Sequence, residues 1–307
     1  MAPKGSERVF TSGEIIYAKT KLNRTETMKE ITIYHSPDAD DAFMFYGLSS
    51  GAITHPDYLF KHELCDIQSL NDRSVKGEID CTAVSVHAFP YLNDQYTILA
   101  CGASMGGAEY GPRLIANKQL NLTDIKTIAL PGALTSATLA MRLYLKEAGI
   151  EADCRQTDFD KVQDLVASGK VDAGLIIHEG QVTSQNDGFT ILLDLGKWWW
   201  DSTNLPLPLG INVVKKDLGE EAIAATAQVL KASIAYGLEH RKEALEYALQ
   251  YGRGLSNKDA DTFVAMYVNE WTLDMGKKGR ESLKLFLKKG FDAGFLPDNW
   301  QPEFFRA

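Results

Sequence analysis

The sequence has few cysteines and no long apolar run, and both absences narrow the classes of protein that it can encode. Its four cysteines, Cys65, Cys81, Cys101 and Cys154, form no CxxC pair, and their spacing fits neither a zinc site nor a compact disulfide framework. No apolar run approaches the roughly 18 residues that a membrane-spanning helix needs. We therefore expect reduced cysteines, no metal site and no membrane span.

Basic residues are also scarce. The 307 residues contain 32 Lys and Arg against 41 Asp and Glu, which gives a net charge of −9. An acidic chain without a basic cluster is a poor partner for nucleic acid or an anionic membrane. The sequence also lacks a phosphate-binding loop, a GxGxxG motif and a GxSxG motif, so a nucleotide cofactor and serine-hydrolase chemistry have no support. A small molecule or another protein remains as the partner, with the oligomeric state left open.

The first residues of the sequence do not resemble a secretion signal, and we expect no export. Residues 1–27 are polar and mixed in charge, without the apolar core that an export signal requires. We interpret residues 1–28 as an N-terminal extension, which is either a disordered tail or the result of a translation start assigned too far upstream. We expect a cytoplasmic protein. The full sequence is 45% apolar and long enough for two domains.

Short β-rich runs alternate with helical patterns, which predicts an α/β architecture with mostly parallel sheets. From residue 220 onward apolar residues recur at helical spacing and predict a C-terminal helical layer. A weak echo joins two segments, 77–81 (GEIDC) and 169–173 (GKVDA). Each follows an amphipathic helix and opens a buried strand that ends in polar residues. Two similar halves of this kind predict two lobes facing a central cleft.

Two segments rich in glycine and proline mark where the chain would cross between the lobes. They are residues 102–112 and the LPLPLG segment at 205–210. We therefore predict a discontinuous first lobe, residues 29–112 and 211–307, and a second lobe, residues 113–210. Two crossing segments allow the lobes to close around a ligand by a hinge motion.

Two strand–turn–helix segments offer candidate ligand contacts. In the first, Ser36 and the loop amides can present donors, while Asp40 or Asp41 can cap the following helix. In the second, Thr135, Ser136 and Ala137 open a helix whose hydroxyls and backbone N–H groups suit a carboxylate or oxyanion. A plain Ser/Thr helix cap explains the second segment equally well.

His178 is the candidate general base. It ends a buried strand where the strand opens into the predicted cleft, with Glu179 beside it, and a neutral imidazole accepts a proton near neutral pH. The alternative is a purely structural histidine. His87 is its counterpart in the first lobe and a candidate polar wall of the cleft. The other histidines have no metal-like spacing.

Three consecutive tryptophans, residues 198–200, precede the second crossing segment. Aromatic side chains beside a hinge could cover an aromatic ligand, because they bury a large area with few rotamers to restrict. The competing interpretation is a helix packed on the domain boundary.

Taken together, these segments resemble the 1,4-dihydroxy-6-naphthoate synthase family of the futalosine route to menaquinone. The resemblance covers about residues 30–295. It rests on the GLIIHE segment at 174–179, the DLG at 194–196 followed by the tryptophans, LPLPLG at 205–210, Ser36-Pro37, Asp41-Ala42-Phe43, Gly132 with Thr135-Ser136-Ala137, and YVN at 267–269.

The resemblance implies a two-lobed periplasmic-binding-protein-like fold of type 2. It implies cofactor-free cleavage of cyclic dehypoxanthinylfutalosine to 1,4-dihydroxy-6-naphthoate, a carbon–carbon lyase reaction with His178 as the base. It further implies that Thr135, Ser136 and Ala137 hold the substrate carboxylate and that Ser85 is a polar contact in the first lobe.

Two positions depart from the family pattern. Asp38 stands where the family has cysteine, and Ala83 stands where a lysine precedes the lobe-one serine by two places. Both bear on which substrate is bound. The alternatives are a solute-binding protein for a small anionic or aromatic ligand, and the chorismate dehydratase of the same pathway. The GLIIHE and LPLPLG segments fit the synthase better.

Overall fold

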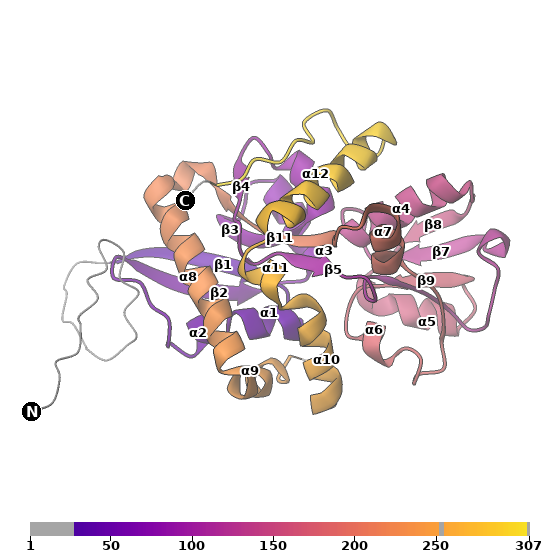
Figure 1. Cartoon of the computed structure of the whole chain (residues 1–307), viewed down its shortest axis with the longest axis horizontal. Helices are drawn as coiled ribbons and strands as arrows, with labels where there is room; N and C mark the ends of the chain where they lie inside the picture. Colours follow the sequence, from indigo (N-terminus) through magenta and orange to yellow (C-terminus); the bar gives the residue numbers. More distant parts are fainter. Residues whose placement is uncertain (1–27, 252–254, 306–307) are drawn as a thin grey trace, which may run out of the picture.

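The computed structural model describes residues 28–251 and 255–305, and its strands form two sheets, seen at the left and right of Figure 1. The predicted extension therefore lies, except for Met28, outside the described residues. The first sheet has the order β2-β1-β3-β11-β4, with β5 paired to β11, and the second has the order β10-β6-β9-β7-β8. The strands are β1 (Lys29–His35), β2 (Tyr58–Leu64), β3 (Cys81–Ser85), β4 (Tyr96–Ile98), β5 (Ser104–Gly106), β6 (Arg113–Ala116), β7 (Thr127–Leu130), β8 (Asp153–Gln156), β9 (Ala173–Ile176), β10 (Thr190–Asp194) and β11 (Leu207–Lys215).

The expectation of mostly parallel sheets is wrong. In the described part of the chain, four strand pairings are parallel and five are antiparallel. The antiparallel pairings all involve β6 or β11, the strands on which the chain enters each sheet after crossing between them.

The two predicted crossing segments are hydrogen-bonded to each other. Strand β5 pairs with the start of β11, so that Leu207 lies opposite Gly106 and Gly210 opposite Ser104, with a register shift after Pro208. The connection between the sheets is thus a short antiparallel ribbon. The strands of the second sheet all come from residues 113–194, and those of the first sheet lie outside that range. We keep the division at 112 and 211 as a proposal and use "first lobe" and "second lobe" in that sense.

The sequence echo corresponds to two helix ends of the same geometry. Helix α3 (Ile67–Val75) leads to Gly77 and helix α5 (Val162–Ala167) leads to Gly169, and both glycines have a φ of +69°. In each case the glycine N–H and the next N–H donate to carbonyls of the last helical turn, and the chain then enters a central strand. Glycine adopts this left-handed conformation without steric cost, which explains the repeated residue.

The remaining helices cover the sheets. Those before residue 206 are α1 (Ala39–Met44), α2 (Tyr46–Ser49), α4 (Ser136–Ala148), α6 (Gly180–Thr183) and α7 (Leu195–Thr203). The predicted C-terminal helical layer is α8 (Glu220–Glu239), α9 (Arg241–Ala248), α10 (Asn257–Tyr267), α11 (Glu270–Leu273) and α12 (Gly276–Asp292), drawn in orange to yellow in Figure 1.

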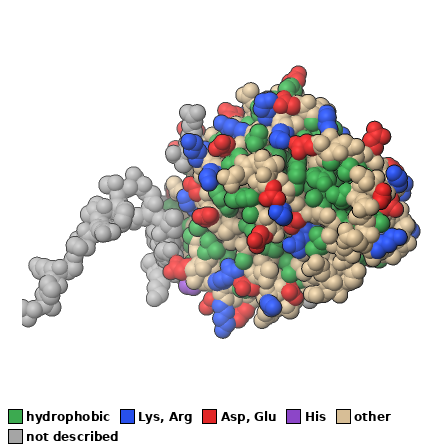
Figure 2. All heavy atoms as spheres, turned by 45° about the vertical axis from the view of Figure 1, so that its right-hand side comes forward, with side chains coloured by type: hydrophobic (Ala, Val, Ile, Leu, Met, Phe, Trp, Pro, Cys, Tyr) green, Lys and Arg blue, Asp and Glu red, His purple; other side chains and the backbone are tan. Residues whose placement is uncertain are grey.

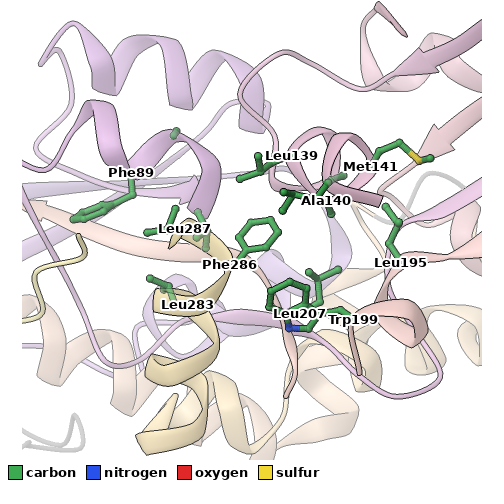
Figure 3. Close-up of a cluster of buried hydrophobic side chains, with 14 of the residues drawn as sticks. Phe89, Leu139, Ala140, Met141, Leu195, Trp199, Leu207, Leu283, Phe286 and Leu287 are labelled. Atoms are coloured by element: carbon green, nitrogen blue, oxygen red, sulfur yellow. The ribbon is translucent and has the colours of Figure 1, made fainter. Parts of the chain in front are cut away.

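Helix α12 joins the two lobes through a shared apolar core. Its Phe286 lies between α4 and α7, near Leu139 and Trp199 (Figure 3). The Trp199 ring is fully buried at 5.4 Å from the Phe286 ring, and its indole N–H donates to the Ser282 hydroxyl at 3.0 Å. For this tryptophan the packing interpretation is the correct one.

The surface in Figure 2 carries acidic and basic side chains interspersed across the face shown, together with scattered apolar ones. Within residues 28–251 and 255–305, no helix combines the length and the apolar character needed to cross a bilayer.

Candidate active site

A cavity lies between the lobes, at the ends of β1, β3 and β9 and beside the start of α4. Five residues of the predicted site line it, and they come from separate segments of the chain: Ser36, Ser85, Thr135, Ser136 and Ala137. The other three predicted residues, His87, His178 and Glu179, do not line the cavity. Each of them is bonded to, or directly follows, a residue near its wall.

The side-chain hydroxyls of both residues at the start of α4 are hydrogen-bonded to other groups of the protein. Thr135 is the N-cap, and its Oγ1 accepts the Thr138 N–H and donates toward the Gly132 carbonyl or the Thr138 hydroxyl. The Ser136 hydroxyl donates to the Leu209 carbonyl at 2.5 Å. Neither hydroxyl proton is therefore available to a ligand. The capping interpretation describes Thr135, whereas the Ser136 side chain bonds to Leu209 and His87.

The backbone at the start of α4 remains as an anion-binding element. The first N–H groups of a helix have no partner within the helix, and the N–H groups of Ser136 and Ala137 have no acceptor among the described residues. Both residues line the cavity. An anionic oxygen placed there would receive these hydrogen bonds and the favourable end of the helix dipole.

The opposite side of the cavity is acidic. Asp41 accepts the Ser36 N–H at 2.8 Å, and the Ser36 hydroxyl donates to Asp38 at 2.8 Å. Asp38 occupies the N-cap position of α1, whereas the sequence suggested Asp40 or Asp41 as the cap. Burial, reinforced by neighbouring carboxylates, raises the pKa of Asp40 well above its usual range and that of Asp41 to about 7.

Those raised pKa values change what this side can bind. A protonated carboxyl donates one hydrogen bond and still accepts others. Asp38, Asp40 and Asp41 all line the cavity, so this wall can pair with hydroxyl groups and is unsuited to a phosphate or carboxylate.

His178 follows β9 and is 8% exposed. Its Nδ1 accepts the Gly180 N–H at 3.0 Å, so the neutral ring carries its proton on Nε2. The ring meets Phe159 edge-on, with 5.6 Å between ring centroids. A carboxylate oxygen of Glu179 lies 4.0 Å from Nδ1, and its other oxygen accepts the Ala39 N–H from the first lobe at 3.4 Å. The histidine thus sits on a segment that touches both lobes.

His87 connects the lobes and does not face the cavity. Its Nδ1 lies 3.0 Å from the Thr135 carbonyl, and its backbone N–H donates to Ser136 Oγ at 3.3 Å. Burial lowers the pKa of His87 to about 4. A neutral ring with its proton on Nδ1 is therefore the form that donates to this carbonyl and supports the start of α4.

Comparisons with known proteins agree with this architecture. A protein-family model described as menaquinone biosynthesis matches residues 31–292. The chain belongs to this family. It is 32% identical over 277 residues to a Thermus thermophilus protein named 1,4-dihydroxy-6-naphtoate synthase, covering 90% of this chain and all of that protein. A Streptomyces coelicolor protein of the same name is 30% identical over 269 residues, covering 87% of this chain and 95% of its own.

Solved structures confirm the predicted two-lobed fold. A protein of Archaeoglobus fulgidus has 38% identity and a TM-score of 0.82, covering 87% of this chain and 98% of that one. The alkanesulfonate-binding protein of Xanthomonas axonopodis pv. citri, solved with MOPS, has a TM-score of 0.71 at 12% identity, covering 92% and 100%. At that identity the likeness shows the periplasmic-binding-protein fold alone.

Three residues of the site were missed by sequence reasoning. Gln181 and Tyr267 line the cavity from opposite lobes, and Asn71 holds the side chain of Ser85. Tyr267 stands in the YVN segment that contributed to the resemblance, which was a usable signal. Gln181 follows the GLIIHE segment by two residues, and Asn71 lies within an ordinary amphipathic helix.

Proposed function

We propose that this protein converts cyclic dehypoxanthinylfutalosine to 1,4-dihydroxy-6-naphthoate, as a cofactor-free carbon–carbon lyase of the cytoplasm. Family membership and the names of two full-length relatives support the reaction. The observation that carries it in the structure is the cavity, where five predicted residues from separate segments meet.

The two sides of the cavity match the two ends of such a substrate. The N–H groups of Ser136 and Ala137 suit the carboxylate on the aromatic end. The carboxyl groups of Asp38 and Asp40 suit the hydroxyls of the sugar-derived end, because both accept hydrogen bonds and the protonated carboxyl of Asp40 also donates one. Closure of the lobes would exclude water and fix the substrate between these walls.

His178 would remove the proton that starts the elimination, and formation of the aromatic naphthalene ring would drive loss of the sugar-derived fragment. In the present conformation Nδ1 already accepts the Gly180 N–H, and Nε2 holds the proton. The proposal therefore includes a turn of the ring, or a shift of the segment after Ile177, when substrate binds. Ile177, the residue before His178, lines the cavity, so this segment already borders it. Glu179 would then stabilise the imidazolium.

The test is incubation of purified protein with cyclic dehypoxanthinylfutalosine, with the product followed by chromatography and mass detection. We expect turnover in the wild type and at least about a 100-fold loss in His178→Asn, the size of a general-base contribution. His55→Asn is the matched control, since His55 does not line the cavity, and it should retain full activity.

Three other results would contradict the proposed mechanism or the proposed activity. A His178→Asn variant with near-normal turnover removes the histidine from the mechanism. Heat-stabilisation of the protein by the compound without any product indicates a binding protein. Dehydration of chorismate, supplied in a parallel incubation in place of that compound, indicates the dehydratase.

A further inference from the structure

Ser85 is held by two hydrogen bonds to one side chain. Its backbone N–H donates to Asn71 Oδ1 at 2.8 Å, and its Oγ accepts a hydrogen bond from Asn71 Nδ2 at 3.1 Å. Asn71 is 0% exposed and Ser85 is 4% exposed. Asn71 lies within α3, whose first turn is capped by the Asp66 side chain, so both partners stand on regular secondary structure.

The orientation of the Asn71 amide follows from chemistry. A backbone N–H can only donate, so the atom facing it must be the amide oxygen. The amide nitrogen then faces Ser85 Oγ, and that nitrogen is a donor without acceptor capacity. Ser85 therefore cannot give its own hydroxyl proton to Asn71.

The hydroxyl proton of Ser85 is available to a ligand in the cavity. Ser85 lines the cavity wall, and within the described ranges its hydroxyl donates to no protein acceptor. This is the reverse of Thr135, Ser136 and Ser36, whose hydroxyl protons are directed to protein oxygens. Of the four cavity-lining hydroxyls that the sequence singled out, Ser85 alone offers a proton to a ligand.

The surroundings of Ser85 add no positive charge to this donor. Ala83 lies two residues earlier on β3 and also lines the cavity, and no lysine or arginine is among the described residues that line it. An oxygen bound at this end therefore meets a neutral hydroxyl.

We propose that Asn71 is a positioning residue for the reaction, and that it makes Ser85 an obligate hydrogen-bond donor to a carboxylate or carbonyl oxygen of the substrate. This inference rests on the proposed function for the identity of the reaction. It adds the direction of one hydrogen bond and the residue that sets it.

Asn71→Asp tests the direction directly. The carboxylate keeps the shape of the side chain and the acceptor for the Ser85 N–H, but it replaces the donor NH₂ by a second acceptor. In the Asn71→Asp variant the Ser85 hydroxyl proton then points to the introduced carboxylate and away from the substrate. We expect KM to rise about tenfold, the loss of roughly one hydrogen bond, with a smaller change in kcat.

A double-mutant comparison separates positioning from structural support. Ser85→Ala should itself raise KM, and adding Asn71→Asp to it should change KM no further, because no hydroxyl proton remains to be turned. Asn71→Ala, which only frees the hydroxyl to rotate, should raise KM less than Asn71→Asp although it creates a larger void. Thermal unfolding of each variant identifies those that fail to fold.

Two outcomes overturn the inference. One is an Asn71→Asp effect that is equally large in the Ser85→Ala background, which would make Asn71 a purely structural residue. The other is an unchanged KM in Ser85→Ala. Both leave the proposed function intact when the wild type still forms 1,4-dihydroxy-6-naphthoate, whereas absence of that product in the wild type tells against the function itself.

Discussion

The Tyr267 hydroxyl donates a hydrogen bond to the Gln181 side-chain oxygen, and this bond joins α10 of the first lobe to α6 of the second. Both side chains are buried and line the cavity. Burial raises the pKa of Tyr267, so the hydroxyl keeps its proton across the physiological range. Helix α6 begins two residues after His178. The Tyr267 hydrogen bond therefore links the segment that carries the histidine to the opposite lobe.

Tyr267→Phe should weaken the closed arrangement of the lobes. The change leaves the Gln181 oxygen without its partner in a buried site, which costs about 1–3 kcal/mol. We expect kcat/KM to fall about tenfold or more. Steady-state kinetics with the substrate provide the measurement.

Tyr96→Phe is the matched control for that variant. Tyr96 is equally buried, and its hydroxyl donates to the Ile79 carbonyl within the first lobe. It should lower the melting temperature and leave kcat/KM unchanged. Equal kinetic losses in the two variants would show that the Tyr267 bond acts on general stability and not on the cleft.

Thr135→Val should act on the helix and only indirectly on the substrate. The hydroxyl caps α4 and is not free to contact a ligand. Loss of a threonine N-cap costs about 1 kcal/mol of unfolding free energy, measurable by urea denaturation. Thr135→Ser keeps the cap oxygen and should restore most of it. A large rise in KM for Thr135→Val with unchanged stability would instead indicate that the hydroxyl contacts the substrate.

Asp40→Asn should stabilise the protein, and more so at higher pH. Burial and the neighbouring carboxylates raise the pKa of Asp40 above its value of about 3.8 in the unfolded chain. The folded state therefore binds more protons than the unfolded state, and stability falls as pH rises above that value. The neutral amide removes this penalty.

The Asp40→Asn gain should be small at pH 4 and about 2–4 °C in melting temperature at pH 8, the shift that about 1 kcal/mol produces in a chain of this kind. Scanning calorimetry at both pH values measures it. Asp217→Asn changes an exposed carboxylate and should show no such pH-dependent gain. A gain of equal size at pH 4 and pH 8 would contradict the electrostatic explanation.

Local sequence signals were sufficient for many of the elements. Helix α4 begins where the sequence predicted, at the turn before Ser136, because Thr135 caps its start, and it ends at Ala148, before Gly149 in a left-handed conformation. The helix expected after the loop that contains Ser36 is instead divided at Phe45 into α1 and α2. Phe45 is buried against the His35 ring, 4.0 Å away between ring centroids, a tertiary contact that periodicity does not reveal.

Site residues were predictable where the local sequence of a single segment indicated their role. Ser136 and Ala137 follow a turn and open a helix, so their N–H groups could be anticipated from sequence. Gln181 and Tyr267 are 86 residues apart and meet only because the lobes close upon each other. Asn71 is a polar residue on the buried side of α3, and its role exists only because β3 brings Ser85 beside it.

The place of β11 in the first sheet has a consequence for synthesis of the chain on the ribosome. This strand lies between β3 and β4, so the first sheet stays open until residues 207–215 have been made. The strands of the second sheet, all within residues 113–194, are complete before that. Since domains form as their residues emerge, we expect the inserted second lobe to fold first, with the earlier-made strands of the first lobe completing their sheet afterwards.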